Sequence, residues 1–278
     1  MTTLRLAGRW LTHAAFGLGS FYGFLGVVAR ANYRVFVYPG AYARGAAVSA
    51  REPDVERLAL TASDGEPARA LWLSPPRAQR LVVYFHGNGN IAEDQIPLAR
   101  DLVRRDLAVM IVEYRGYGAS SGGKPDEQGI YRDVEAALDE ARRRGFPADR
   151  VALWGVSLGT GVAAEMETRG RGARLVLLSP FTSLTDAARV HAPWWLPAGM
   201  VIPDRFDTLS KAGSIRIPTL IVHGDADDVV PFAHGELLAR TIAGARLVRV
   251  PGGHHDDLFE VGGPAVLDGI VRHCSGLD

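Results

Sequence analysis

The sequence predicts an α/β fold, a mostly parallel sheet of eight strands with helices on both faces. From about residue 55, short apolar runs alternate with longer amphipathic stretches, which is typical of strands joined by crossover helices. The 278 residues suffice for one such domain, and 47% hydrophobic and 22% charged residues exclude a disordered chain. The single cysteine, Cys274, excludes an intrachain disulfide framework and a cysteine-cluster metal site.

The strands and helices are predicted from these runs. Val55–Thr61 and Ala68–Leu73 flank an Asp-Gly turn signal and predict an antiparallel hairpin at the sheet edge. Short apolar runs predict six further strands: Leu81–Phe85, Ala108–Tyr114, Val151–Trp154, Leu175–Ser179, Thr219–His223 and Arg246–Val250. Helical patterns cover Glu93–Arg105, Asp126–Arg144, Thr160–Thr168, Ala233–Ala243 and Pro264–His273.

The amino-terminal segment combines positive charge with an uncharged stretch. Residues 1–51 hold six arginines and no acid, while the whole chain balances 31 basic against 31 acidic residues, which argues against a nucleic-acid partner. Leu11–Ala29 has no charged residue and would be about 28 Å long as a helix, enough for a hydrocarbon core. We predict that residues 1–32 are a leader that anchors the protein to a membrane through residues 11–29. A helix packed on the protein's own surface, in a cytoplasmic protein, and a cleaved signal peptide are the alternatives.

One connection interrupts the alternation. Phe181–Ile217 contains no clear strand, and its middle, Ala192–Pro203, reads APWWLPAGMVIP without a charge. An apolar insertion near the carboxyl ends of the strands is a natural lid, and a loop that packs on the sheet is the alternative. We therefore expect one domain at residues 33–278, with a cap at about residues 181–217.

The strongest chemical signal is Gly155-Val156-Ser157-Leu158-Gly159. It directly follows an expected strand and precedes an expected helix, which is the setting of an activated serine on a strained turn. Glycines flank such a serine because side chains there would clash with neighbouring backbone. A second glycine-rich segment, His86-Gly87-Asn88-Gly89-Asn90, follows another strand. We expect the N–H groups of Leu158 and Asn88 to form an oxyanion hole. No phosphate-loop spacing is present.

A serine nucleophile needs a base, and the base needs an orienting acid. Two later strand ends supply candidates in the chain order expected for a strand-end serine, first aspartates and then histidines. The aspartates are Asp225, Asp227 and Asp228, and the histidines are His254 and His255. The positions of these residues in the sequence do not show which aspartate is the acid and which histidine is the base. Because His-His-Asp-Asp lacks the helical spacing of two metal ligands, we expect no metal site and no cofactor.

These residues resemble the α/β-hydrolase superfamily of serine hydrolases, in particular its amino-terminally anchored α/β-hydrolase-domain branch and bacterial relatives. The matching segments are His86–Asn90, Tyr114–Gly118, Gly155–Gly159, His223–Pro231 and Gly253-His254. The resemblance implies an α/β-hydrolase fold with a small lid insertion. It also implies Asp227 as the acid and His254 as the base, with His86 and His223 shaping loops.

The predicted function is hydrolysis of a carboxylic ester or thioester through an acyl-serine, as in a carboxylesterase, lipase or thioesterase. Ser157, His254 and Asp227 would form the catalytic triad. The apolar lid and the anchor favour an acyl-chain or lipid-like substrate. A peptidase of the same fold and a catalytically silent hydrolase-like binding protein are the alternatives.

Overall fold

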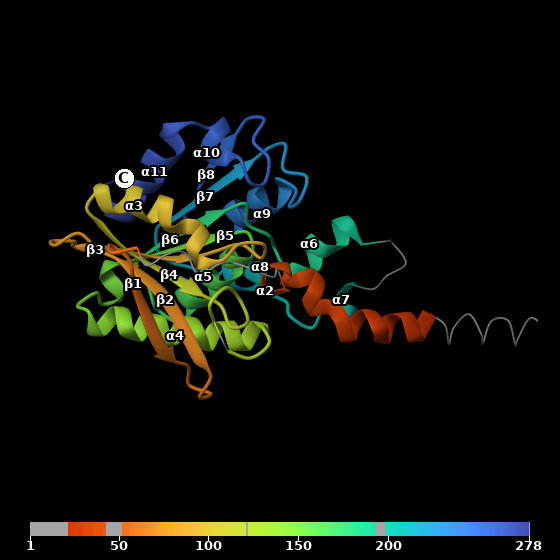
Figure 1. The fold of residues 1–278 in the computed structure, drawn as a ribbon. Helices are drawn as coiled ribbons and strands as arrows, with labels where there is room; N and C mark the ends of the chain where they lie inside the picture. Colours follow the sequence, from red (N-terminus) through yellow and green to blue (C-terminus); the bar gives the residue numbers. More distant parts are fainter. Residues whose placement is uncertain (1–21, 43–51, 121, 193–197, 278) are drawn as a thin grey trace, which may run out of the picture.

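The structure is a computed structural model that describes residues 22–42, 52–120, 122–192 and 198–277 (Figure 1). Most of the predicted anchor, Leu11–Ala29, lies outside the described residues, and only its last eight residues, 22–29, lie within them. No helix in the described ranges is both long enough and apolar enough to cross a membrane.

An eight-stranded sheet organises the described chain, as predicted. Its spatial order is β1-β2-β4-β3-β5-β6-β7-β8. β1 and β2 pair antiparallel, β2 pairs antiparallel with β4, and every later pair is parallel. The strands are β1 (Glu56–Thr61), β2 (Pro67–Leu73), β3 (Arg80–Phe85), β4 (Leu107–Glu113), β5 (Val151–Val156), β6 (Arg174–Leu178), β7 (Thr219–Gly224) and β8 (Arg246–Val250). The parallel strands therefore end at one common edge of the sheet.

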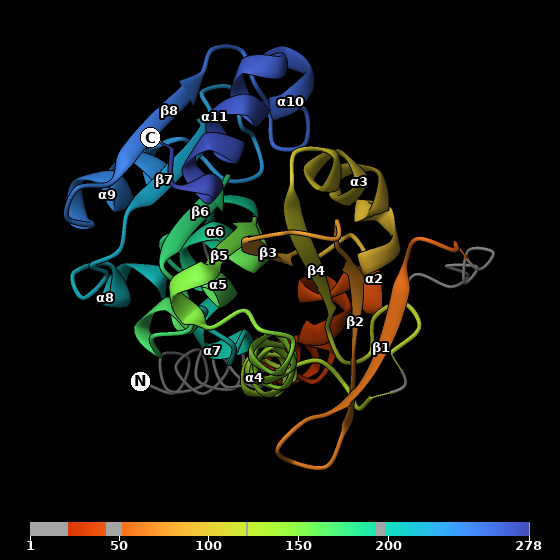
Figure 2. The same cartoon turned by 90° about the vertical axis from the view of Figure 1, so that its left-hand side faces the viewer.

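Helices cover both faces of this sheet (Figure 2). One face is covered by α3 (Ile96–Arg104), preceded by the 3₁₀ turn η1 (Ala92–Gln95), and by α10 (Leu258–Val261) and α11 (Pro264–Ser275). The other is covered by α4 (Glu127–Arg143), α5 (Leu158–Thr168), α8 (Thr208–Ala212) and α9 (Ala233–Thr241). A further 3₁₀ turn, η2 (Ala148–Arg150), leads into β5. Because both faces are covered, the central strands β3, β4 and β5 are almost fully buried, which explains their continuous apolar sequences.

The insertion between β6 and β7 holds α6 (Leu184–His191), α7 (Ala198–Val201) and α8. Residues 22–37 form a helix beside α6 and α7, followed by α2 (Pro39–Tyr42). Figure 1 shows this amino-terminal helix extending away from the sheet. Its described part packs on the protein through Tyr33 and Val37, each only 5% exposed. The predicted boundary between residues 32 and 33 lies inside this continuous helix.

Candidate active site

Ser157 lies on a sharp turn between β5 and α5, at the common edge of the sheet. Its backbone has φ 50° and ψ −114°, a left-handed φ that a non-glycine residue rarely adopts. The Ser157 N–H donates to the Leu178 carbonyl at 2.9 Å, and the Thr160 hydroxyl donates to the Ser157 carbonyl at 2.6 Å. Backbone and side-chain hydrogen bonds therefore hold the serine in this strained conformation, with its hydroxyl beyond the strand end.

The flanking glycines are required by close backbone contacts. A Cβ at Gly155 would collide with the carbonyl oxygen of Gly159, and a Cβ at Gly159 would collide with the carbonyl oxygen of Phe85 in β3. The serine turn thus packs directly on the neighbouring strand and on its own helix. The glycine spacing seen in the sequence follows from this packing.

Ser157, His255 and Asp227 form a hydrogen-bonded chain across three strand ends. His255 Nε2 lies 2.9 Å from Ser157 Oγ, and His255 Nδ1 lies 2.8 Å from Asp227 Oδ2. A proton on Nδ1 donates to the carboxylate and leaves Nε2 free to accept from the serine hydroxyl. His255 is well buried, with 9% of its side chain exposed, so the ring has little freedom to leave this position.

The structure brings His255, and not the predicted base His254, to Ser157. The His254 side chain is 58% exposed, and its Nδ1 lies 4.0 Å from the exposed carboxylate of Asp228. The His254 N–H donates to Asp257 at 2.6 Å, which fixes the loop with the His254 ring turned outward. The resemblance pointed to His254 in the Gly-His pair, whereas the histidine that contacts the serine is the next residue. The sequence signal for this ambiguity was the pair of adjacent histidines, because either one could face the serine.

Asp227 is the aspartate that the structure brings to the histidine. Its Oδ1 accepts the backbone N–H groups of Val229 and Val230 at 2.9 and 2.7 Å, and its Oδ2 also lies 3.2 Å from His223 Nε2. Burial alone would raise the pKa of Asp227, but hydrogen bonds from His223 and His255 outweigh it and hold the pKa far below its ordinary value. The carboxylate is therefore charged at neutral pH.

The other two candidate aspartates lie elsewhere. Asp225 pairs with Arg249 at 2.7 Å and accepts the Gly252 N–H at 2.6 Å, so it shapes the loop after β8. Asp228 has 80% of its side chain exposed. His223, predicted to shape its loop, is fully buried and contacts the Val230 carbonyl at 2.9 Å.

Asn88 and Leu158 line the same cavity as Ser157. In the described part of the chain, the backbone N–H of neither residue donates to a protein acceptor. The Asn88 carbonyl accepts the Gly40 N–H and the Tyr117 hydroxyl, each at 3.0 Å, and its side-chain amide donates to the Val37 carbonyl at 3.3 Å. The amino-terminal helix and the loop after β4 thus fix the position of Asn88.

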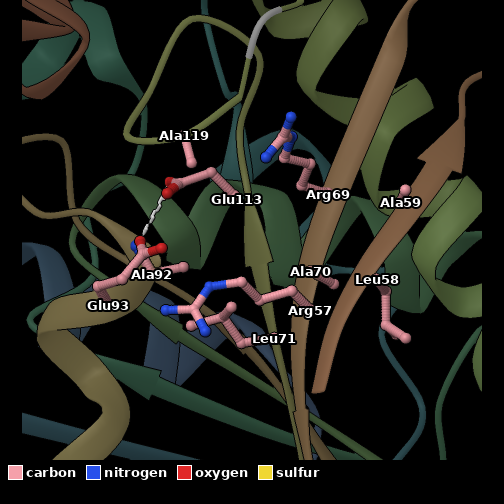
Figure 3. Close-up of a pocket in the computed structure, with 10 residues that line it drawn as sticks. All are labelled: Arg57, Leu58, Ala59, Arg69, Ala70, Leu71, Ala92, Glu93, Glu113 and Ala119. Atoms are coloured by element: carbon pink, nitrogen blue, oxygen red, sulfur yellow. Dashed lines mark hydrogen bonds between the residues drawn. The ribbon is translucent and has the colours of Figure 1, made fainter. Parts of the chain in front are cut away.

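A small cavity of about 120 Å³ lies between β1, β2, the turn η1 and the end of β4 (Figure 3). Glu93 and Glu113 line it, and Glu113 accepts the Ala92 N–H. Glu113 also lies 3.2 Å from Nε2 of the buried His86, the residue that begins the glycine loop. Burial and the neighbouring Glu113 carboxylate raise the pKa of Glu93. Ser157 is not among the residues that line this cavity.

Two larger cavities meet at Ser157, Asn88 and Val229. The first, about 560 Å³, has mostly apolar walls from the amino-terminal helix, α6 and α7. The second, about 510 Å³, has several polar groups, among them Asn90, Gln95 and Asp256. A substrate placed across the serine would therefore have one apolar and one polar side.

Two family models match the chain. The model described as "Serine aminopeptidase, S33" matches residues 76–206, which include Ser157, and the model described as "Serine hydrolase (FSH1)" matches residues 175–255, which include Asp227 and His255. Together the matches span the strand ends that carry these three side chains.

Relatives and solved structures agree with these matches. The chain is 37% identical over 194 residues to an uncharacterized Mycobacterium tuberculosis protein, covering 69% of this chain and 68% of the relative. It is 32% identical over 218 residues to human alpha/beta hydrolase domain-containing protein 17B, covering 76% and 73%. An esterase from Pyrococcus furiosus has the same fold, with a TM-score of 0.67 at 19% identity over 82% of this chain and 97% of that one. An Exiguobacterium antarcticum esterase has a TM-score of 0.63 at 19% identity, covering 78% and 98%.

The sequence relatives, the family models and the eight-stranded sheet with a strained serine at its edge agree on one assignment. This chain belongs to the α/β-hydrolase family of serine hydrolases.

Proposed function

We propose that this protein hydrolyses esters or thioesters of acyl chains through an acyl-serine intermediate. The observation that carries the proposal is the hydrogen-bonded chain from Asp227 through His255 to Ser157, with the serine opening on an apolar cavity. The acyl chain would occupy the apolar cavity, and the alcohol or thiol would leave through the polar one.

In this mechanism Ser157 Oγ attacks the acyl carbonyl carbon while its proton passes to His255 Nε2. The N–H groups of Asn88 and Leu158 would hold the oxygen that becomes negative. As the carbon–oxygen or carbon–sulfur bond breaks, Nε2 returns the proton to the leaving atom. Water then attacks the acyl-serine and gives a proton to Nε2, which passes it to Ser157 as the carboxylic acid departs.

The proposal is tested by covalent labelling and by substrate comparison. A fluorophosphonate probe is expected to label the purified protein at Ser157, located by mass spectrometry, and to leave Ser157→Ala unlabelled. p-Nitrophenyl acyl esters and acyl thioesters are expected to be hydrolysed. Labelling at another residue, or no turnover of either substrate class, would refute the mechanism.

An aminopeptidase is a second candidate, favoured by the description of one family model. Such an enzyme needs an acidic group near the serine to hold the substrate amine, and Asp256 lines the polar cavity. Aminoacyl p-nitroanilides separate the two functions. Faster turnover of the nitroanilides than of the acyl esters would favour the peptidase. We place the esterase first because the larger cavity at Ser157 is apolar.

We also propose that the amino-terminal segment binds the protein to an anionic lipid surface. The helix at residues 22–37 exposes Phe24 (63%) and Val27 (67%), and carries Arg30 and Arg34 without an acidic residue. Exposed apolar side chains and arginines both favour such a surface. We expect co-sedimentation with phosphatidylglycerol vesicles, reduced several-fold in Phe24→Asp/Val27→Asp. Equal sedimentation of both proteins would contradict this proposal.

A further inference from the structure

The inward face of the amino-terminal helix lies against the apolar cavity at Ser157. Ala29, Tyr33 and Val37 follow one another at intervals of four residues, so they share one side of the helix. All three line the cavity, together with Phe36. The helix thus contributes one wall of the space into which the serine opens.

The helix is fixed to both sides of that cavity. At its carboxyl end, the Val37 carbonyl accepts the Asn88 side-chain amide at 3.3 Å, beside the serine. Near Ala29, the Arg30 guanidinium donates to the Met200 carbonyl of α7 at 2.8 Å. The buried Tyr38 hydroxyl donates to Asp204 at 2.6 Å, just beyond α7. These bonds join the helix and the residue that follows it both to the loop that carries Asn88 and to the cap.

The remaining walls are apolar. They come from α6 and α7 and the segments beside them, with Leu184, Ala187, Ala188, Val201 and Ile202 among the lining residues. Among the described residues that line this cavity, only His191 and Tyr33 have ionisable side chains. A hydrocarbon chain is therefore the ligand that these walls fit best, because its burial is favourable and leaves no polar group unpaired.

The length of the cavity can be taken from the helix that lines it. Val37, near the serine, and Ala29 are eight residues apart, which is about 12 Å along a helix. An extended chain advances ~1.2 Å per bond, so roughly ten bonds fit in this distance. Ala29 is the small residue at the distal end, where a larger side chain would shorten the space.

We infer that the helix at residues 22–37 is a wall of the acyl site and that the site takes linear acyl chains of roughly ten carbons, with Ala29 beside the chain's distal end. This inference rests on the proposed esterase function. Substrate specificity would then depend on a segment outside the sheet domain, as well as on the cap.

The test is a chain-length series of p-nitrophenyl esters from acetyl to palmitoyl. The wild-type kcat/KM is expected to be highest near decanoyl. Ala29→Trp is expected to lower kcat/KM for the decanoyl ester by about tenfold, the effect of excluding about two methylene groups from an apolar pocket, and to leave the butyryl ester unchanged. Ala31→Trp, at an exposed position of the same helix that does not line the cavity, is the matched control and should match wild type.

The outcomes separate this inference from the proposed function. If the wild type hydrolyses the esters but Ala29→Trp treats all chain lengths as the wild type does, the helix is not a wall and the esterase function stands. An equal loss for butyryl and decanoyl esters also overturns the inference, because the change then acts on the catalytic groups. If Ala29→Trp does not fold, Ala29→Leu is read by the same criteria. A wild type without turnover of any ester refutes the proposed function itself.

Discussion

Replacing His255 by alanine is expected to lower kcat for ester hydrolysis by about four orders of magnitude or more, as the loss of a triad member does in other serine hydrolases. His255 Nε2 is the group that the described structure places within hydrogen-bonding distance of Ser157 Oγ, so its loss removes the acceptor of the serine proton. Ser157→Ala is expected to cause a similar loss. The double variant should be little worse than either single one, because the two residues act as a unit. Steady-state kinetics on a soluble ester measures all three.

His254→Ala is the matched control for this prediction. The two histidines are adjacent in one loop, but the His254 ring is mostly exposed and contacts neither Ser157 nor Asp227. We expect kcat within about threefold of wild type, since surface substitutions usually have small effects. If His254→Ala were inactive and His255→Ala active, the assignment of the base would be reversed.

The largest expected effect on stability comes from a buried charge cluster at the end of β4. Arg115 is 5% exposed and Asp133 of α4 is fully buried. Asp133 accepts the Arg115 backbone N–H at 2.9 Å and its guanidinium at 2.7 Å. Hydrogen bonds from the same guanidinium lower the pKa of Asp64, in the β1–β2 turn, to about 2. One arginine therefore joins the hairpin, β4 and α4.

Asp133→Ala is expected to lower the free energy of unfolding by about 3 kcal/mol, because among the described residues it leaves the buried guanidinium with only Asp64 as a hydrogen-bonding partner. Urea unfolding followed by circular dichroism measures the loss. Asp139→Ala is the control on the same helix, since the Asp139 side chain is 53% exposed in its pair with Arg171. This substitution should lower the free energy of unfolding by less than about 1 kcal/mol.

A second comparison tests the cause of this loss. The double variant Arg115→Met/Asp133→Leu removes both charges and is expected to recover much of the stability. If the double variant unfolds as readily as Asp133→Ala, the destabilisation comes from lost packing and not from an unpaired charge.

Much of the fold could be predicted from local sequence. The continuous apolar run at Leu81–Phe85 and the alternation of strands and helices predicted the buried parallel sheet, because a strand covered on both faces needs apolar residues throughout. The serine turn was equally predictable. Gly155 and Gly159 are there because any side chain would clash with backbone, so the requirement is visible in the sequence itself.

The identity of the histidine beside the serine could not be predicted in this way. Adjacent side chains in a loop point in different directions, and only the path of the loop decides which one faces the serine. That path depends on the contact of Asp225 with the Gly252 N–H and on the bond from the His254 N–H to Asp257. The first of these contacts joins residues 27 positions apart in the sequence, so it forms only in the tertiary structure.

The sequence by itself determined the sheet, the strained serine and a set of acids and bases at strand ends, because these depend on local periodicity and on steric limits of the backbone. Tertiary structure decided that His255 pairs with Asp227 and that residues 22–37 pack beside the serine. An apolar helical face such as Ala29, Tyr33 and Val37 suits lipid or protein equally, since the hydrophobic effect is non-directional. Only the arrangement of the cap and the loop that carries Asn88 gives that face its place at the cavity.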